Sequence, residues 1–375
     1  MDNETLKQLH PKVSIIIIHY NTPQYLQTCF DAILQQTYQN IEIIFIDNNS
    51  PASSSEGVAN KETSALGGHP DKSGLEFIKK KYGNVSSVKI VANEENIGFA
   101  RAANQGIRMA IENTENPADY VVITNPDIIY TPSYFEIIIE RMGKDPKIAA
   151  ITGKVYKYDF DRQKPTNIID TVGIFAYKSR RFIDDGQGLI DEGQFDKECE
   201  IFGVSGACPL YRREALEDVK VLEEYFDEDF FMYKEDVDLS WRFLLYGWKN
   251  LFYPKAVAYH GRGTGVQRRF FNKEVLAIRN KLSKFQKQHS FTNQHLMEAK
   301  NELWSNFFMD FIPIMIKKLA VFAYITVKEP YLWISYFKYL KKLPKILKKR
   351  AIIMKNKKIS AKEMRKWFKK QSQYI

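Results

Sequence analysis

Apolar stretches alternate with amphipathic stretches along the first third of the chain. The apolar ones are VSIIIIHYN (13–21), IEIIFIDNNS (41–50), SSVKIVAN (86–93) and DYVVITNPD (119–127). Each is short and rich in β-branched residues, which is typical of a buried strand. TPQYLQTCFDAILQQ (22–36) and GFARAANQGIRMAIEN (98–113) have helical spacing between them. The alternation predicts an α/β domain with a mainly parallel central sheet and helices on both faces.

Polar side chains end each of the four predicted strands. They are His19, Tyr20 and Asn21 on the first, Asp47, Asn48 and Asn49 on the second, Asn93 on the third, and Asn125 and Asp127 on the fourth. Parallel strands bring their carboxyl ends to one edge of a sheet, where ligands gather. Turn-forming Asn and Asp explain each strand end singly. A shared nucleotide-type site explains the whole set better.

Asp127 and His260 are candidate ligands of a metal ion. Pro126 can simply end the fourth strand and leave Asp127 to start a turn. Alternatively, the strand delivers a carboxylate to a crevice. His260 ends another predicted strand, KNLFYPKAVAYH (249–260), although a single histidine is more often a structural residue. A carboxylate and an imidazole together suit Mn²⁺ or Mg²⁺.

Six acidic residues lie between positions 227 and 238, next to the aromatic residues of FFMYKEDVD. A helix is expected from about Asp236 onward, so an Asp here can be a helix cap. An acid held against aromatic side chains also tends to have a raised pKa, which suits a general base. Taken alone, this stretch leaves both interpretations open.

The ordered set VSIIIIHYN, IFIDNNS, NIGFARAANQG, TNPD, GACPLYRREAL, FFMYKEDVDLSWRFLLYGW and AYHGRG resembles the inverting family-2 glycosyltransferases of the GT-A fold. DDGQG (184–188) is similar to a segment of the rhamnosyltransferase-like branch. The resemblance covers residues 12–290. It implies a glycosyltransferase domain over 1–290, with a nucleotide-binding half (12–130) and an acceptor and catalytic half (131–290), followed by a tail (291–375).

The resemblance also implies a role for individual residues. The nucleotide would be held by His19, Tyr20, Asn21, Asp47, Asn49, Asn96, Gly98, Arg101, Asn104 and Asn125. Asp127 and His260 would bind Mn²⁺ or Mg²⁺, with Asn125 in place of the first acid of the family's D-x-D motif. Glu235 and Asp236 match the catalytic acid pair, with Asp236 as the base. The implied reaction is a single displacement that inverts the anomeric carbon.

Two departures from the family pattern bear on the substrate. Residues 51–74 form a Ser/Gly/Ala-rich insertion after the second strand, interpreted as a mobile loop. The Q-x-x-R-W motif of processive synthases is missing, since QRRF (267–270) does not match it. We therefore expect transfer of one sugar, with L-rhamnose as the first choice, from a dTDP- or UDP-sugar to a lipid-linked or polysaccharide acceptor.

Charge is concentrated in the tail. The chain carries a net charge of +10, but residues 313–375 hold 18 Lys and Arg against two acids. A uniform nucleic-acid-binding surface is therefore excluded. Residues 311–355 interleave lysines with Trp, Tyr, Phe and aliphatic residues, which is typical of an interfacial helix on anionic lipid. The alternative is a basic helix packed on the body or on a partner.

Several sequence features bear on the cellular compartment and on the competing functions. It has three cysteines without C-x-x-C spacing and a polar start without an apolar signal region. We expect a cytoplasmic protein, peripheral on the inner face of the cell membrane. An NAD-dependent oxidoreductase is disfavoured because HYNTPQ lacks the G-x-G-x-x-G turn. A non-catalytic, nucleotide-sugar-binding scaffold of the same fold is the main alternative.

Overall fold

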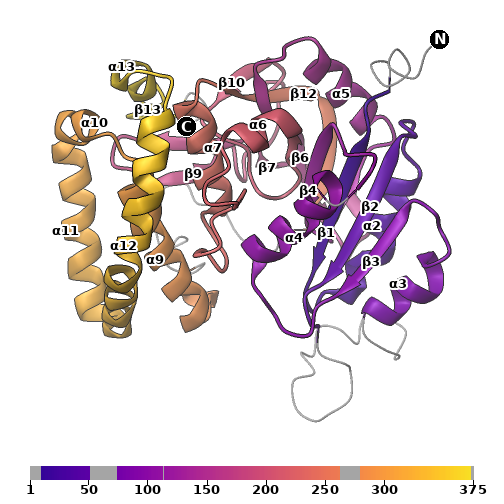
Figure 1. Ribbon diagram of the computed structural model, residues 1–375, viewed down its shortest axis with the longest axis horizontal. Helices are drawn as coiled ribbons and strands as arrows, with labels where there is room; N and C mark the ends of the chain where they lie inside the picture. The colour runs from indigo at the N-terminus through magenta and orange to yellow at the C-terminus, as the bar shows by residue number, and fades with distance from the viewer. Residues whose placement is uncertain (1–9, 51–73, 113, 262–278, 373–375) are drawn as a thin grey trace.

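The computed structural model describes residues 10–50, 74–112, 114–261 and 279–372 (Figure 1). A ten-stranded central sheet contains β1 (Val13–His19), β2 (Ile41–Asp47), β3 (Val88–Ala92), β4 (Tyr120–Thr124), β5 (Ile128–Tyr130), β6 (Ile148–Asp159), β7 (Lys164–Thr171), β10 (Cys199–Ile201), β11 (Leu210–Arg212) and β12 (Lys249–His260). A smaller sheet contains β8 (Ile174–Tyr177), β9 (Phe182–Asp184) and β13 (Phe368–Lys369).

Helices surround the central sheet and form one end of the molecule. They are α2 (Pro23–Leu34), α3 (Gly74–Tyr82), α4 (Phe99–Ile111), α5 (Tyr134–Gly143), α6 (Arg213–Asp218), α7 (Glu235–Leu245), α9 (Lys284–Asn301), α10 (Trp304–Met309), α11 (Phe311–Lys328), the 3-10 turn η1 (Pro330–Leu332), α12 (Trp333–Asn356) and α13 (Ala361–Arg365). Helices α9, α11 and α12 lie on the side of the molecule opposite β1–β3 (Figure 1).

The central sheet follows the order β10-β12-β6-β11-β4-β1-β2-β3. Its β3-β2-β1-β4 half is entirely parallel, and β6 and β12 are also parallel to each other. Strand β11 runs antiparallel to both of its neighbours and joins the two parallel parts. The predicted α/β fold with a mainly parallel core sheet is confirmed.

Alternation along β1 explains why both faces of the sheet are covered. Ile15 and Ile17 pack in one apolar cluster with residues of α2, α3 and α5. Ile16 and Ile18 point to the other face, into a cluster with residues of α4 and α7. Successive strand side chains point to opposite faces, so a continuous apolar run requires helices on both sides.

The segment between β2 and β3 differs from the sequence interpretation. Residues 74–82 form α3, a helix that the sequence reading missed, and Ile78 and Tyr82 are buried against the sheet. A preceding Ser/Gly-rich stretch and the polar run of Lys79, Lys80 and Lys81 made its short apolar face hard to recognise. The rest of the predicted loop, 51–73, lies outside the described residues, as does QRRF at 267–270.

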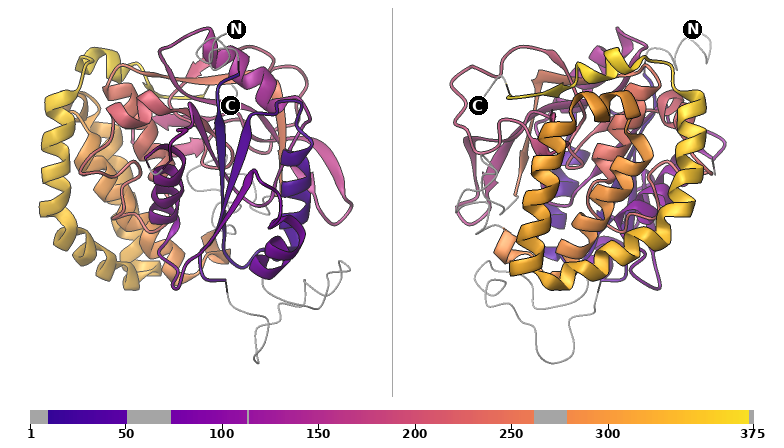
Figure 2. Two further views of the ribbon diagram at one scale, coloured as in Figure 1. Left: turned by 45° about the vertical axis from the view of Figure 1, so that its right-hand side comes forward. Right: turned by 90° about the vertical axis from the view of Figure 1, so that its left-hand side faces the viewer.

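The tail packs closely on the body of the molecule. Helix α9 begins at Lys284 and ends at Asn301, so a domain boundary at 290/291 falls inside it. Leu296 and Met297 of α9 belong to the same apolar cluster as α4 and α7, and β13 pairs with β8. Figure 2 shows the tail helices α9, α11 and α12 side by side on one face of the molecule. Among the described helices, none has the length and apolar character needed to cross a bilayer.

Candidate active site

The parallel register brings the predicted polar strand ends to one edge of the sheet. His19 pairs with Asp47, and Asp47 pairs in turn with Ala92, which precedes Asn93. Strand β4 pairs with β1 up to Ile17 and Thr124, so Asn125 follows at the same edge. Four strand ends are therefore adjacent, which no single stretch of sequence specifies.

Asp47 is held ionised by His19 and Ser50. The Thr22 N–H donates to His19 Nε2 at 3.2 Å, so the imidazole carries its proton on Nδ1 and donates to Asp47 Oδ1 at 2.7 Å. The Ser50 N–H donates to Asp47 Oδ2 at 3.1 Å. Burial opposes ionisation, but these hydrogen bonds outweigh it and lower the pKa of Asp47.

His19 itself is fully buried, with both ring nitrogens bonded inside the protein. This geometry makes it a residue that orients Asp47. Tyr20, Asn21 and Asn49 are exposed at the edge, and both asparagines have positive φ angles, 54° and 61°. Asn tolerates this conformation better than most residues, which accounts for its use at these turns.

A network of side-chain amides connects β2 and β3 to the start of α4. Asn96 Oδ1 accepts from Asn48 Nδ2 at 2.9 Å and from the Gly98 N–H at 3.0 Å. Asn48 Oδ1 accepts from Asn93 Nδ2 at 3.1 Å and from the Ile97 N–H at 3.2 Å. The sequence predicts Asn48 and Asn93 as strand-end residues without a site role of their own. The network fixes the turn that opens α4.

Gly98 permits close contact between this turn and the segment before α7. Its φ of 84° and ψ of 164° are accessible essentially to glycine alone. A Cβ there would lie 2.7 Å from both the carbonyl oxygen and a ring carbon of Phe231. The Phe99 N–H donates to that same carbonyl at 2.7 Å. Gly98 therefore lets the turn that opens α4 contact the segment before α7.

We predict that Gly98→Ala lowers the unfolding free energy by about 2 kcal/mol, because it adds backbone strain and a clash with Phe231. Urea denaturation measures the change. Gly143→Ala is the matched control, since a Cβ at Gly143 meets nothing within 4 Å. There the free energy should rise by up to about 1 kcal/mol. Equal effects of the two substitutions would contradict the assignment.

Arg101 and Asn104 occupy different surroundings on α4. Asn104 is fully buried: its Nδ2 donates to the Phe226 carbonyl at 2.8 Å, and its Oδ1 accepts from the Phe226 N–H at 2.8 Å. Asn104 thus fastens the 226–228 segment to α4. Arg101 is exposed, with its guanidinium 3.7 Å from Glu228. Of these two predicted nucleotide contacts, Arg101 is the one placed at the surface.

Asp127 and His260 are brought together by pairing between β5 and β12. His260 pairs with Ile128, and the Gly261 N–H donates to the Asp127 carbonyl at 2.9 Å. His260 Nε2 lies 3.2 Å from Asp127 Oδ1, and Nδ1 lies 2.8 Å from Asp170 Oδ2. Burial opposes a charged imidazole, but the two carboxylates outweigh it and raise the pKa of His260 to about 9.

Asp170, at the end of β7, is a residue that sequence reasoning missed. It is fully buried beside His260. Metal-binding histidines commonly use their second nitrogen to bond a carboxylate, which fixes the ring and its tautomer. Nδ1 of His260 has that partner in Asp170, and Nε2 and Asp127 offer one nitrogen and one oxygen donor. This donor set fits a divalent cation of the Mn²⁺ or Mg²⁺ type.

Glu235 and Asp236 are the first two residues of α7, directly after a turn with unusual backbone angles. Tyr233 and Lys234 both have positive φ angles, 69° and 73°. The Gly206 N–H donates to Asp236 Oδ2 at 3.0 Å. Burial raises the pKa of Asp236, and burial together with the neighbouring Asp236 raises the pKa of Glu235 to about 8. A pKa of about 8 keeps Glu235 mostly protonated at neutral pH, whereas Asp236 remains the candidate base of the pair.

Residues 206 and 207 connect Asp236 to the Asp127 turn. Gly206 donates to Asp236, and the Ala207 carbonyl accepts from the Asn125 N–H at 3.0 Å. Asn125 in turn accepts from the Ile128 N–H at 3.3 Å, which closes the turn around Asp127. The small residues of GAC thus hold both candidate acids from adjacent backbone positions.

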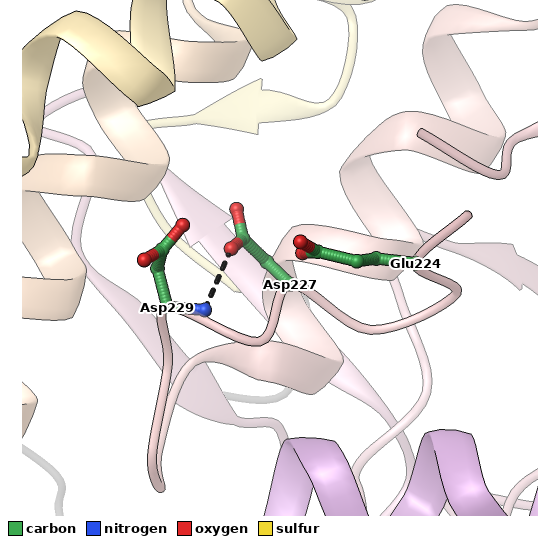
Figure 3. A group of neighbouring side chains, drawn as sticks. All are labelled: Glu224, Asp227 and Asp229. Carbon is green, nitrogen blue, oxygen red and sulfur yellow. Dashed lines mark hydrogen bonds between the residues drawn. The ribbon is translucent and has the colours of Figure 1, made fainter. Parts of the chain in front are cut away.

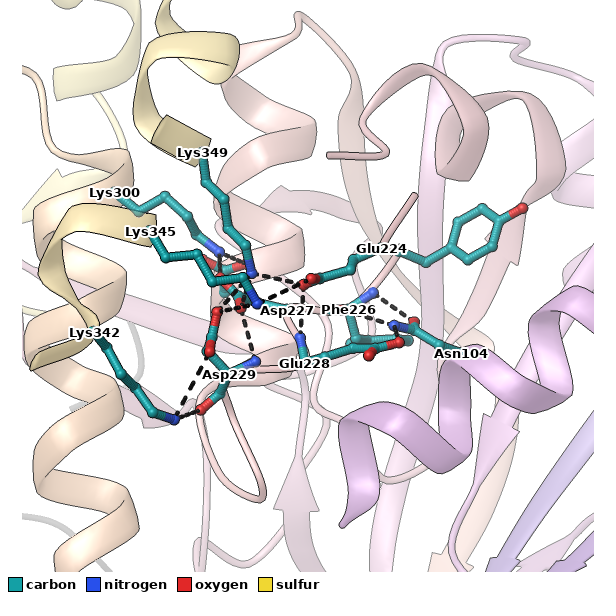
Figure 4. Close-up of polar contacts among 12 residues, drawn as sticks. Asn104, Glu224, Phe226, Asp227, Glu228, Asp229, Lys300, Lys342, Lys345 and Lys349 are labelled. Carbon is teal, nitrogen blue, oxygen red and sulfur yellow. Dashed lines mark hydrogen bonds and ion pairs between the residues drawn. The ribbon is translucent and has the colours of Figure 1, made fainter. Parts of the chain in front are cut away.

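A second group of carboxylates, Glu224, Asp227 and Asp229, has the spacing of a cation site (Figure 3). Lysines from the tail already neutralise it (Figure 4). Lys349 Nζ lies 2.6 Å from Glu224 and 3.0 Å from Asp229, and Lys300 bonds to Asp227. We therefore interpret this group as a structural ion-pair network. Carboxylates of the acid-rich stretch thus form ion pairs with lysines of the tail, which local sequence patterns do not show.

Comparison with known proteins supports the resemblance. The family model "Glycosyl transferase family 2" matches residues 14–220. The chain is 30% identical over 148 residues to the glycosyltransferase GlyG of Streptococcus pneumoniae, covering 39% of this chain and 40% of that protein. It is 26% identical over 206 residues to the N-acetylglucosaminyl-diphospho-decaprenol L-rhamnosyltransferase of Mycobacterium tuberculosis, covering 48% and 61% of the two chains.

A third relative is the poly-beta-1,6-N-acetyl-D-glucosamine synthase of Staphylococcus epidermidis, 26% identical over 247 residues, which are 66% of this chain and 49% of the synthase. The chain thus spans between 40% and 61% of the length of these three relatives. The family match ends before Asp236 and His260, so their assignment rests on motif and geometry. Because the match covers more than half of the chain, this protein belongs to glycosyl transferase family 2.

Proposed function

We propose that the protein is an inverting glycosyltransferase that moves one sugar from a nucleoside diphosphate to an acceptor hydroxyl. One observation supports this most directly: backbone atoms of Gly206 and Ala207 hold Asp236 and the Asp127 turn from adjacent positions. A family-2 domain with an acid for the donor phosphate side and an acid for the acceptor side meets the needs of a single displacement.

In this mechanism Asp236 accepts the proton of the acceptor hydroxyl. The hydroxyl oxygen forms its bond to the anomeric carbon as the bond from that carbon to the diphosphate oxygen breaks, and the nucleoside diphosphate leaves. Asp127 and His260 would hold a Mn²⁺ or Mg²⁺ ion. When bound, such an ion stabilises the negative charge of the leaving diphosphate. Asp170 orients His260 toward Asp127.

The donor side is assigned to the exposed edge formed by Tyr20, Asn21, Asn49 and Arg101, with Asp47 oriented by His19. We propose a dTDP- or UDP-sugar as donor, with L-rhamnose as the first sugar to test. The acceptor is a lipid-linked or polysaccharide glycan of the cell surface. The enzyme then works as a peripheral protein on the inner face of the cell membrane, where such an acceptor is anchored.

We predict that dTDP or UDP binds in the presence of Mn²⁺ and that Asp127→Asn weakens this binding by at least about tenfold, because the ion loses its carboxylate ligand. Isothermal titration calorimetry with and without Mn²⁺ measures both constants. Asp196→Asn, at a side chain that is 66% exposed, is the matched control and should bind like the parent. Folded protein that binds neither nucleotide would overturn the proposal.

A non-catalytic scaffold of the same fold makes a different prediction. It would bind the nucleotide sugar in the same titration but release no nucleoside diphosphate when an acceptor is added. Measuring diphosphate release over a panel of dTDP- and UDP-sugars separates the two functions. Nucleotide binding without turnover on any donor and acceptor pair would favour the scaffold.

A further inference from the structure

The outer face of α10 and α11 is covered by exposed apolar side chains. Ile312 is 71% exposed and Val327 is 73% exposed, at opposite ends of α11. The exposed residues between and beside them are Trp304, Phe308, Met309, Phe311, Ile316, Leu319 and Phe322. On α11, Ile312, Ile316, Leu319 and Phe322 recur at intervals of three and four residues, so they form one stripe along that helix. A stripe of this extent on a water-facing helix indicates an interaction surface.

Two lysines of α11 are turned toward the protein, away from this stripe. Lys317 Nζ lies 3.1 Å from Glu298 of α9, and Lys318 Nζ lies 2.7 Å from the same carboxylate. Ile314 and Ile325 are buried on the inner side of the helix. Helix α11 is therefore anchored to the protein along one face, and the apolar stripe lies on its exposed side, where Thr326 and Lys328 are also exposed.

The exposed charges on α10, α11 and α12 have a single sign. Lys338, Lys341 and Lys348 are exposed on α12, which lies on the same side of the molecule as α11 (Figures 1 and 2). Asp310 and Glu329 are the only acids in residues 303–360. Both are buried, and both are paired with Arg or Lys. Helices α10, α11 and α12 thus combine an apolar stripe with exposed lysines and carry no exposed acid.

We infer that α10, α11 and the lysine-bearing face of α12 dock on the surface of an anionic lipid bilayer, with the α11 stripe inserted among the acyl chains. The exposed lysines favour a lipid bilayer over a second copy of the chain as the partner. Two copies facing each other across the stripe would bring lysines against lysines with no acid to pair them. Anionic headgroups supply the opposite charge beside an apolar layer.

Docking in this manner would place the bilayer and the catalytic segment on two sides of α12. Lys342 donates to the Asp229 carbonyl at 2.6 Å, and Lys349 bonds to Asp227 and Glu224, so the inner side of α12 holds the segment that leads to Asp236. The inference deepens the proposed membrane location by naming its surface. It does not depend on glycosyl transfer.

Vesicle flotation tests the inference with the full-length chain. We expect the protein to float with vesicles of phosphatidylcholine and phosphatidylglycerol, and far less with phosphatidylcholine alone. The Ile316→Asp/Leu319→Asp variant should bind the anionic vesicles at least about tenfold more weakly, since each change puts a carboxylate into the lipid. Ile190→Asp is the matched control, since Ile190 is 55% exposed and outside the stripe, and it should bind like the parent.

Lys341→Gln and Lys348→Gln should each weaken binding to anionic vesicles by about fivefold, because each removes one attraction to the headgroups. Light scattering on the same samples reports association between copies. The inference is overturned if the folded parent does not bind anionic vesicles, or if Ile316→Asp/Leu319→Asp binds as the parent does. It is also overturned if the parent is a dimer that this variant dissociates. None of these readouts requires nucleotide binding or turnover.

Discussion

Asp236→Asn should reduce the rate of nucleoside diphosphate release in the presence of acceptor by about 10³-fold. The amide has the shape of the carboxylate but cannot accept the proton of the attacking hydroxyl. Its oxygen can still accept from the Gly206 N–H, so the fold and the donor site should be preserved. Calorimetry should therefore give an unchanged affinity for dTDP or UDP, and only the transfer rate should fall.

Glu235→Gln is the control that separates the two neighbouring acids. Because the pKa of Glu235 is raised to about 8, its carboxyl is already protonated at neutral pH, and glutamine imitates that form. We expect its rate at pH 7 to stay within about tenfold of the parent, a smaller loss than removal of a general base causes. A large loss in Glu235→Gln with little loss in Asp236→Asn would reverse the assignment.

The pH profile gives an independent check on the base. Burial raises the pKa of Asp236 above its ordinary value of 3.8, and a base works only when ionised. The rate should therefore fall as the pH drops through that raised pKa, and this acid limb should be absent from the residual activity of Asp236→Asn. An unchanged acid limb in the variant would assign the limb to another group.

Lys300→Met should lower the free energy of unfolding by about 3–5 kcal/mol, the range for breaking a buried ion pair. Lys300 is 2% exposed, bonds to Asp227, and lies 2.9 Å from Asp238. Methionine has a similar length, so packing is largely retained while two buried carboxylates lose a shared cation. Urea denaturation followed by circular dichroism measures the loss.

Lys345→Met is the matched control for the same network. Its side chain is 48% exposed and lies 2.9 Å from Asp229 and 3.4 Å from Glu224, and an ion pair with such an exposed lysine contributes at most about 1 kcal/mol. Adding Asp227→Asn to Lys300→Met should recover part of the loss, because Asp227 then has Lys349 as its remaining lysine partner and its buried charge is less well compensated. Equal destabilisation by Lys300→Met and Lys345→Met would show that burial does not govern this network.

Low pH should weaken the ion pairs of Asp227 with Lys300 and Lys349, over a pH range set by the pKa of Asp227. Burial opposes ionisation of Asp227, but Lys300 and Lys349 outweigh it and lower its pKa well below 3.8. A carboxyl with a depressed folded pKa stabilises the protein above its unfolded pKa, and this contribution is lost as the pH falls through the folded value. Stability from the network is thus present at neutral pH and lost only in strong acid.

The order of strands and helices could be predicted from the sequence because it depends on local alternation. The apolar runs at 13–21, 41–50, 86–93 and 119–127 became β1–β4 with their polar ends at one edge. The helices at 22–36 and 98–113 became α2 and α4. Buried strands need long apolar runs and helices need a repeating apolar face, so both leave a pattern in neighbouring residues.

The tertiary structure decided which polar side chain meets which. His19 and Asn104 have the same types and spacing as ligand-binding residues, yet packing turns them inward onto Asp47 and Phe226. Asp170 meets His260 across 90 residues, and Lys300 meets Asp227 across 73. A hydrogen bond or ion pair depends on where two distant backbones bring their side chains, and local composition carries no record of that. The same holds for the α11 stripe. Its residues are exposed because the opposite side of the helix is held against α9 by ion pairs of Lys317 and Lys318 with Glu298.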